Sequence, residues 1–402
     1  MDKILLLENK IMDYAWGSRH FIPALTGEEN ISGNPQAEMW MGAHIKAPSF
    51  VRFENDKIPL NRLINDYPGA ILGNSVADRF SRELPFLFKV LAASKPLSIQ
   101  SHPDREQAER GFERENKQGI SPDARTRNYR DKNHKPELIC ALTEMWALKG
   151  FREPGSISDL FRPFEDIFNK SGTAILKDPE RIGDLKSFFS DLLYLGHREK
   201  DQILAGISGI KDSVINSRQE YEWIYRLANE YPGDIGVFAP LFLNLVHLDP
   251  GEAVYLPARE LHAYLEGSGL EIMANSDNVL RGGLTPKHID RTELLNVLDF
   301  SPADFNKIRP KGISEFEKIY ESPAGEFALS VIALPDNRSE YKSLSGHNVE
   351  ILLCTEGCAD IRGKIPGTVK LKKGMSALVP SSAGPYKITG KTIIYKATVP
   401  DC

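Results

Sequence analysis

Residues 248–257 read Leu-Asp-Pro-Gly-Glu-Ala-Val-Tyr-Leu-Pro, and residues 371–380 read Leu-Lys-Lys-Gly-Met-Ser-Ala-Leu-Val-Pro. The two stretches align without a gap: both have a leucine, a glycine three residues later, an aliphatic residue and a final proline. A glycine between two short apolar runs is typical of a turn that joins two β-strands. Five residues after the first proline stands His262, whereas Pro385 stands at the matching place in the second copy. The repeat predicts two related β-domains, of which only the first keeps the histidine.

A second stretch, Leu-Ser-Ile-Gln-Ser-His-Pro-Asp at 97–104, offers partners for that histidine. Gln100 and His102 stand two residues apart in a strand-like run, so their side chains point to the same face. His-Lys-Pro-Glu at 134–137 can supply a carboxylate from Glu137, and His262 a second imidazole. Two histidines, a glutamate and a glutamine suit a borderline divalent ion, best zinc, with room for water or substrate. If the four side chains converge, the chain is a metalloenzyme.

The spacing of apolar residues changes along the chain. Before residue 100 it predicts strands and turns alone, and a densely charged segment at 104–133 predicts a short helix followed by a solvated loop. Two strands follow at 136–142 and 145–151, and helical spacing extends from Ser156 to Tyr231. After that, 239–248 reads as a strand, short strands follow, and a helix is expected at 290–298. The expected units are a first β-domain from 1–152 and 233–312, a helical insertion at 153–232, and a second, metal-free β-domain at 313–402.

The composition is that of an ordinary globular protein, and 402 residues are enough for two or three domains. A net charge of −5 gives no field that attracts nucleic acid, and no long run of Lys or Arg suggests a membrane surface. The leucines at 5–7 are cut short by Glu8, far short of a signal sequence or a spanning helix. Four cysteines argue against a disulfide framework. These features favour a cytoplasmic location.

Longer motifs surround the candidate ligands. They are Tyr-Ala-Trp-Gly-Ser at 14–18, Gln-Ala-Glu-Met-Trp-Met-Gly at 36–42, Pro-Ala-x-x-x-His-Ala-Tyr at 257–264 and Glu-Ile-Met-Ala-Asn-Ser-Asp-Asn-Val-Leu-Arg-Gly-Gly-Leu-Thr-Pro-Lys at 271–287. With Gln-Ser-His-Pro-Asp and His-Lys-Pro-Glu, they resemble the type I mannose-6-phosphate isomerases. The spacing of Gly251, Pro257 and His262 is similar to the second cupin motif. The resemblance implies a mainly β fold with α: two cupin-like jelly-roll β-domains and a helical insertion domain.

The resemblance also implies roles for individual residues. One zinc ion per chain would be held by Gln100, His102, Glu137 and His262, the set that ligand chemistry also selects. Arg281 would be catalytic: its permanent charge can stabilise an enediolate or bind phosphate, but it is a poor base. Glu271 is a better proton carrier, and Lys135 is a further catalytic candidate. Trp16 would line the pocket, and further candidates for contact with the sugar phosphate are Lys89, Ser98, His134, Asp277 and Lys287.

The implied reaction is the interconversion of mannose 6-phosphate and fructose 6-phosphate through a cis-enediol. The implied partner is a small sugar phosphate, with no nucleic acid and no membrane, and the chain is expected to be a monomer. Two other classes stay open. The first is another cupin metalloenzyme acting on sugars, such as an epimerase or an iron dioxygenase, although Gln100 and the cationic residues argue against the latter. The second is a regulatory cupin that binds hexose phosphate without turnover and has no need of Arg281.

Overall fold

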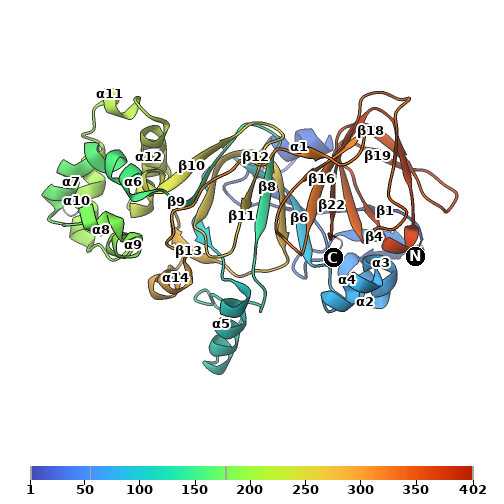
Figure 1. Cartoon of the computed structure of the whole chain (residues 1–402), viewed down its shortest axis with the longest axis horizontal. Coiled ribbons are helices and arrows are strands. Elements are labelled where there is room, and N and C mark those ends of the chain that lie inside the picture. Colours follow the sequence, from blue (N-terminus) through green and yellow to red (C-terminus); the bar gives the residue numbers. More distant parts are fainter. Residues whose placement is uncertain (1, 55, 177–178, 401–402) are drawn as a thin grey trace.

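Two large β-sheets and a separate group of helices make up most of the molecule in a computed structural model that describes residues 2–54, 56–176 and 179–400. The helices of residues 154–230 stand at one end, one large sheet lies in the middle and the other lies at the far end, with further helices beside it (Figure 1). This arrangement confirms the predicted fold class, mainly β with a helical insertion. Within the described ranges, no helix has the length and apolar character needed to cross a bilayer.

The middle sheet has ten strands and surrounds the candidate ligands. Its strands are β2 (Lys10–Met12), β3 (Glu38–Met41), β6 (Phe86–Ala93), β7 (Ile99–Ser101), β8 (Glu137–Ala141), β9 (Met145–Phe151), β10 (Leu243–Leu248), β11 (Ala253–Leu256), β12 (His262–Ala274) and β13 (Leu280–Gly283). The long strand β12 organises them, because its first half pairs with β7 and β9 and its second half with β6 and β8. Residues from four neighbouring strands therefore meet around β12.

The other ten-stranded sheet belongs mainly to the C-terminal quarter of the chain. Its strands are β1 (Leu5–Leu7), β14 (Lys311–Gly312), β15 (Glu317–Tyr320), β16 (Ala328–Leu334), β17 (Glu340–Lys342), β18 (Glu350–Arg362), β19 (Val369–Lys372), β20 (Ser376–Val379), β21 (Lys387–Thr389) and β22 (Thr392–Thr398). The N-terminal strand β1 pairs with β20, so the second β-domain includes a strand that the sequence assigned to the first. A separate hairpin joins β4 (Phe50–Phe53) and β5 (Asp56–Pro59).

The internal repeat has the same local structure in both domains. Its first copy covers the turn from β10 to β11, and its second copy covers the turn from β19 to β20. Gly251 and Gly374 have φ angles of 87° and 81°, a left-handed conformation that glycine adopts without the steric cost other residues incur. The sequence match therefore reflects one strand–turn–strand unit used twice.

The helical insertion is packed on an apolar core of its own that extends to the end of the middle sheet. Its helices are α6 (Pro154–Phe161), α7 (Glu165–Ser171), α8 (Pro179–Gly183), α9 (Leu185–Leu193), α10 (His197–Ile207), α11 (Asp212–Ile215) and α12 (Gln219–Glu230). Phe189 of α9 packs edge to face on Phe151 of β9, with ring centroids 5.5 Å apart. Aromatic pairs of this kind fix helices on a sheet more specifically than aliphatic contacts do.

Two sequence predictions about secondary structure were wrong. The region before residue 100 contains four helices: α1 (Phe21–Thr26), α2 (Leu60–Asp66), α3 (Pro68–Leu72) and α4 (Asn74–Arg79). Leu60, Leu63 and Ile64 are buried at helical spacing, so the signal was present but short. Residues 239–248 are not a single strand, because Ala239–Phe242 forms the helical turn α13 before β10 begins. Pro240 in its first turn favours that start.

Two further helices flank the candidate site. The charged segment begins with α5 (Arg105–Lys117), whose N-terminus is closed by a capping box between Asp104 and Gln107. It spans 13 residues and is therefore longer than the short helix expected. The helix α14 (Arg291–Val297) follows β13 as predicted. α5 begins three residues after the candidate ligand His102, whereas α14 begins eight residues after β13, the strand that carries Arg281.

Candidate metal centre

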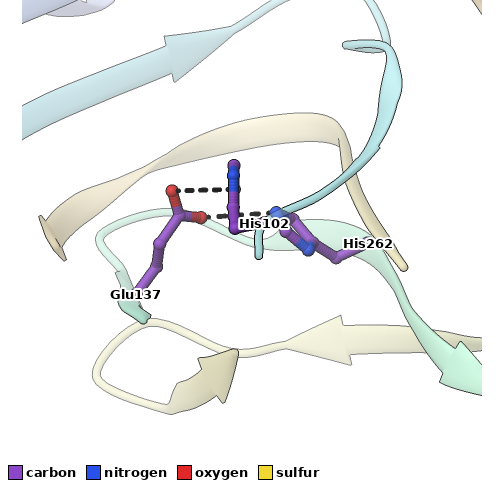
Figure 2. A group of neighbouring side chains, drawn as sticks. All are labelled: His102, Glu137 and His262. Carbon is purple, nitrogen blue, oxygen red and sulfur yellow. Dashed lines mark ion pairs between the residues drawn. The ribbon is translucent and has the colours of Figure 1, made fainter. Parts of the chain in front are cut away.

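Three of the four predicted ligands meet inside the middle sheet. His102 lies just after β7, Glu137 begins β8 and His262 begins β12. Their side chains are almost completely buried and point toward one another (Figure 2). The Nε2 atoms of His102 and His262 lie 3.3 and 3.4 Å from the two carboxylate oxygens of Glu137. The three residues can each offer one ligand atom to a shared ion.

Backbone contacts orient both imidazoles for metal binding. The Nδ1 atom of His102 lies 2.6 Å from the carbonyl oxygen of Asn278, and that of His262 lies 3.0 Å from the carbonyl oxygen of Glu260. A carbonyl accepts hydrogen bonds, so each Nδ1 carries the hydrogen and each Nε2 keeps a lone pair. Within the described residues, neither Nε2 makes a hydrogen bond. Two lone pairs and a carboxylate therefore face each other, an arrangement that fits a cation.

The charges around the site support this protonation pattern. Burial and the nearby Lys135 ammonium together lower the pKa of His102 to about 4, so this imidazole is neutral at pH 7. Burial alone would raise the pKa of Glu137, but Lys135 and the two imidazoles hold it well below its usual range. The Nζ atom of Lys135 lies 2.8 Å from Glu137. Neutral imidazole and ionised carboxylate are the forms that bind zinc.

Gln100 lies in the same row of the sheet as His262 and Arg281. Its backbone is paired with His262 on β12 and with Arg281 on β13. Residues directly paired across antiparallel strands project to the same face, so Gln100 and Arg281 share the face of His262. The placement fits Gln100 as a fourth ligand and Arg281 as its neighbour.

A bulge in β12 brings a second group of side chains to the same interior. The pairing of β12 with β9 shifts register between Tyr264 and Glu266. Because side chains alternate along a strand, the extra residue lets His262 and Tyr264 face inward before the bulge and Glu271 after it. The hydroxyl of Tyr264 lies 3.0 Å from Glu271 and 3.4 Å from Glu137. Tyr264 thus links the metal ligand to the candidate proton carrier.

Glu271 forms a buried ion pair with Lys89. Lys89 Nζ donates to the Glu271 carboxylate at 2.6 Å and lies 4.0 Å from Glu38, and all three side chains are less than one-tenth exposed. Burial raises the pKa of Glu271, although Lys89 opposes that change. Burial alone would lower the pKa of Lys89, but the two carboxylates raise it. Lys89, expected near the phosphate, therefore lies buried against Glu271.

Three cations lie close enough to influence one another, and two of them, Arg281 and Lys287, are predicted to contact the sugar phosphate. Burial and the charge of Arg130 lower the pKa of Arg281, and burial, Arg281 and Arg130 lower the pKa of Lys287. Within the described residues, no ion pair involves the side chains of Arg281, Arg130 or Lys287. Mutually repelling cations in one place are suited to an anion. Arg130 was missed because it stands among many charges in the segment 104–133 and no local pattern sets it apart.

The remaining predicted residues lie around this centre. His134 Nε2 is 2.7 Å from Glu326, a residue of the second β-domain. Asp277 forms an ion pair with Lys46 at 2.8 Å, and its Oδ2 lies 3.5 Å from His44. Trp16 stacks on Tyr14 with ring centroids 5.8 Å apart. Ser98 is partly buried directly before β7. Within the described residues, none of these four forms a hydrogen bond or ion pair with a candidate ligand.

The double β-domain and the buried His–Glu–His cluster define a cupin-like metalloprotein. Comparison with known proteins gives the family. The family model for the catalytic domain of type I phosphomannose isomerase matches residues 4–154, and the model for its helical insertion domain matches residues 166–243. The chain belongs to the type I phosphomannose isomerases.

Individual relatives resemble the chain along almost its whole length. Mannose-6-phosphate isomerase of Escherichia coli (strain K12) is 42% identical over 389 residues, which cover 96% of each protein. The Rattus norvegicus mannose-6-phosphate isomerase is 32% identical over 99% of this chain and 96% of its own length. A solved structure of zinc-bound mannose 6-phosphate isomerase has a TM-score of 0.90 at 39% identity and covers 99% of this chain and 100% of its own. A mutant of Salmonella typhimurium phosphomannose isomerase has the same TM-score, identity and coverage.

Proposed function

We propose that the chain is a zinc-dependent aldose–ketose isomerase that interconverts D-mannose 6-phosphate and D-fructose 6-phosphate. The observation that carries this function is the buried cluster of His102, Glu137 and His262, in which three electron-pair donors face one another. Relatives of the chain are named as mannose-6-phosphate isomerases. The rival reading, a regulatory cupin without turnover, receives no support from the relatives, which are named as isomerases.

The donor set fits zinc. Two imidazole nitrogens and one carboxylate are typical of zinc sites that keep a position open, and a zinc-bound relative has the same fold. We assign His102, Glu137 and His262 as ligands, with Gln100 as the fourth. When bound, zinc would polarise or orient the oxygen atoms at C1 and C2 of the open-chain sugar.

The remaining catalytic roles fall to protein side chains. We assign Glu271 as the group that moves the proton between C2 and C1, because it is a buried carboxylate linked to the ligand Glu137 through Tyr264. Lys89 would keep Glu271 ionised, a role other than the phosphate contact first expected. Lys135 lies against Glu137 and would donate a hydrogen bond to a sugar oxygen. Arg281 would stabilise the enediolate, since a fixed charge costs no reorganisation during the reaction.

Glu271→Gln should lower kcat by roughly 10²–10⁴-fold with little change in KM, because the amide keeps the shape but cannot accept the proton. The measurement is steady-state turnover together with exchange of the substrate C2 hydrogen with solvent. Glu266→Gln is the matched control, since Glu266 lies on the same strand but pairs with Arg226 at the surface. Full exchange in Glu271→Gln would assign the proton transfer to another group.

We propose that Arg130, Arg281 and Lys287 bind the phosphate, with Ser98 at its edge. Arg130→Ala should raise KM roughly 10-fold and weaken inhibition by inorganic phosphate to a similar extent, because one charge-assisted hydrogen bond is lost. Lys132→Ala is the control, since Lys132 is an exposed cation two residues away that faces Glu113. Equal KM values for the two variants would remove Arg130 from the phosphate site.

The function itself is tested on enzyme treated with a chelator. Formation of fructose 6-phosphate from mannose 6-phosphate should disappear after chelation and return with added zinc. Stoichiometric zinc binding without turnover would contradict the isomerase assignment and favour the binding-protein alternative. Oxygen consumption by iron-loaded protein would instead favour the dioxygenase reading.

We also propose the unit boundaries, location and oligomeric state expected from the sequence. The catalytic unit would be 1–152 with 233–312, although β1 pairs with the second β-domain. A cytoplasmic location would give access to a charged substrate that does not cross an apolar bilayer unaided. As a monomer, the chain should sediment at its own mass of 45.0 kDa, and a dimer mass would contradict this proposal.

His134, Asp277 and Trp16 would line the sugar pocket.

A further inference from the structure

We infer that Glu326, a residue of the second β-domain, is a positioning residue for the active site in the first. Glu326 lies in the loop between β15 and β16. Its Oε1 atom is 2.7 Å from His134 Nε2 and 2.9 Å from Arg105 Nη2. His134 stands three residues before Glu137, and Arg105 three residues after His102. One carboxylate therefore ties together the two segments that carry metal ligands.

The contact has the character of a built structural link. Glu326 is only 8% exposed, so little water competes for its carboxylate, whereas the side chains of His134 and Arg105 are 25% and 50% exposed. Arg105 is the first residue of α5, and the capping box of Asp104 and Gln107 fixes that helix start. His134 lies in the irregular stretch before β8, which no helix holds in place. The link from Glu326 therefore has its main effect on the segment 134–137.

The hydrogen bond also determines which nitrogen of His134 is available. In the neutral imidazole, the hydrogen on Nε2 is donated to Glu326, and Nδ1 keeps its lone pair. His134 is partly exposed, so Nδ1 can accept a hydrogen bond from a sugar hydroxyl. The inference rests here on the proposed function, because it gives His134 a substrate contact. It also gives the second β-domain a part in catalysis, through residues 192 positions apart in the sequence.

Glu326→Ala should lower kcat/KM roughly 10- to 100-fold, the size of effect that a misplaced reacting group produces. It should also speed the release of zinc to a chelator, a measurement that does not depend on turnover. Glu326→Gln keeps an oxygen that accepts from Nε2 and should recover most of both losses. Glu321→Ala is the matched control, because Glu321 lies in the same loop and forms an exposed pair with Lys311.

A double-mutant cycle separates positioning from a general loss of structure. If Glu326 acts through His134, adding Glu326→Ala to His134→Ala should change kcat/KM little further. Independent, multiplying losses would overturn the inference, as would a Glu326→Ala protein that matches Glu321→Ala in turnover and zinc release. A wild-type chain without isomerase activity would refute the proposed function, whereas the zinc-release comparison would still decide the role of Glu326.

Discussion

His262→Ala is expected to remove zinc binding and isomerase activity together. The variant loses an Nε2 lone pair that faces Glu137 at 3.4 Å. Changing only an outer partner of a metal ligand lowers metal affinity or activity by about 10- to 100-fold, so loss of a ligand should exceed the upper end of that range. The measurements are zinc content after dialysis and kcat for mannose 6-phosphate.

Thermal unfolding separates the loss of the metal from a loss of fold. An ion that binds only the native state raises its stability, so zinc should raise the Tm of the wild-type chain. The Tm of His262→Ala should not respond to zinc. His197→Ala is the control, because His197 is an exposed histidine at the start of α10. A variant that keeps stoichiometric zinc and normal turnover would remove His262 from the ligand set.

The sequence predicted the parts of the site that depend on local pattern. The i, i+2 spacing of Gln100 and His102 and the turn around Gly251 are short-range features, and the structure places them where alternation and turn geometry require. Residue chemistry selected Glu137 as a partner of His102 although 35 positions separate the two, and the family resemblance selected the same residue. Its contact with the two imidazoles depends on how β8 and β12 pair.

Long-range features could not be read from the sequence. The bulge near Tyr264 decides that both His262 and Glu271 face inward, yet it arises from the pairing of β12 with β9. Lys89 is a strand cation with apolar neighbours, which suggests a site, but nothing in its local pattern indicates its ion-pair partner. Its actual partner, Glu271, stands 182 residues away. Glu326 is equally remote from His134, so no pattern in either segment could have indicated that contact.

The pairing of strands shows that the second β-domain repeats the interior of the first with different charges. Glu271 on β12 is paired with Lys89 on β6, and Lys396 on β22 is paired with Ser330 on β16. β12 pairs with β6 and β8 in the first domain, and β22 pairs with β16 and β18 in the second. The two strands therefore occupy equivalent places in their sheets. Lys396 therefore stands at the position of Glu271.

The carboxylates around it also match. Glu137 is paired with Met273, two residues beyond Glu271, and Glu350 is paired with Thr398, two residues beyond Lys396. Glu350 therefore takes the position of the metal ligand Glu137. Lys396 lies 3.4 Å from Glu350 and 2.6 Å from Glu317. In this domain an internal ammonium group supplies positive charge beside the buried carboxylates.

Lys396→Met should therefore destabilise the protein by about 3–5 kcal/mol, the usual cost of removing one partner from a buried ion pair. Burial alone would lower the pKa of Lys396, but Glu350, Tyr341 and Glu317 raise it, so the side chain is charged at neutral pH. Without it, Glu317 and Glu350 remain buried, and in the part of the chain that the structure describes only hydroxyl groups, such as those of Tyr341 and Tyr386, donate to them. The measurement is the free energy of unfolding in urea.

Two further variants make the test specific. Lys387→Met removes an exposed lysine that pairs with Glu340 at 2.9 Å, and it should cost less than about 1 kcal/mol because surface pairs contribute little. Lys396→Met combined with Glu350→Gln should be less unstable than the sum of the single changes, since the amide removes one of the charges left unpaired. Additive costs, or a Lys396→Met variant as stable as Lys387→Met, would show that the ammonium does not balance Glu350. In that case the hydroxyl donors alone would sustain the buried carboxylates.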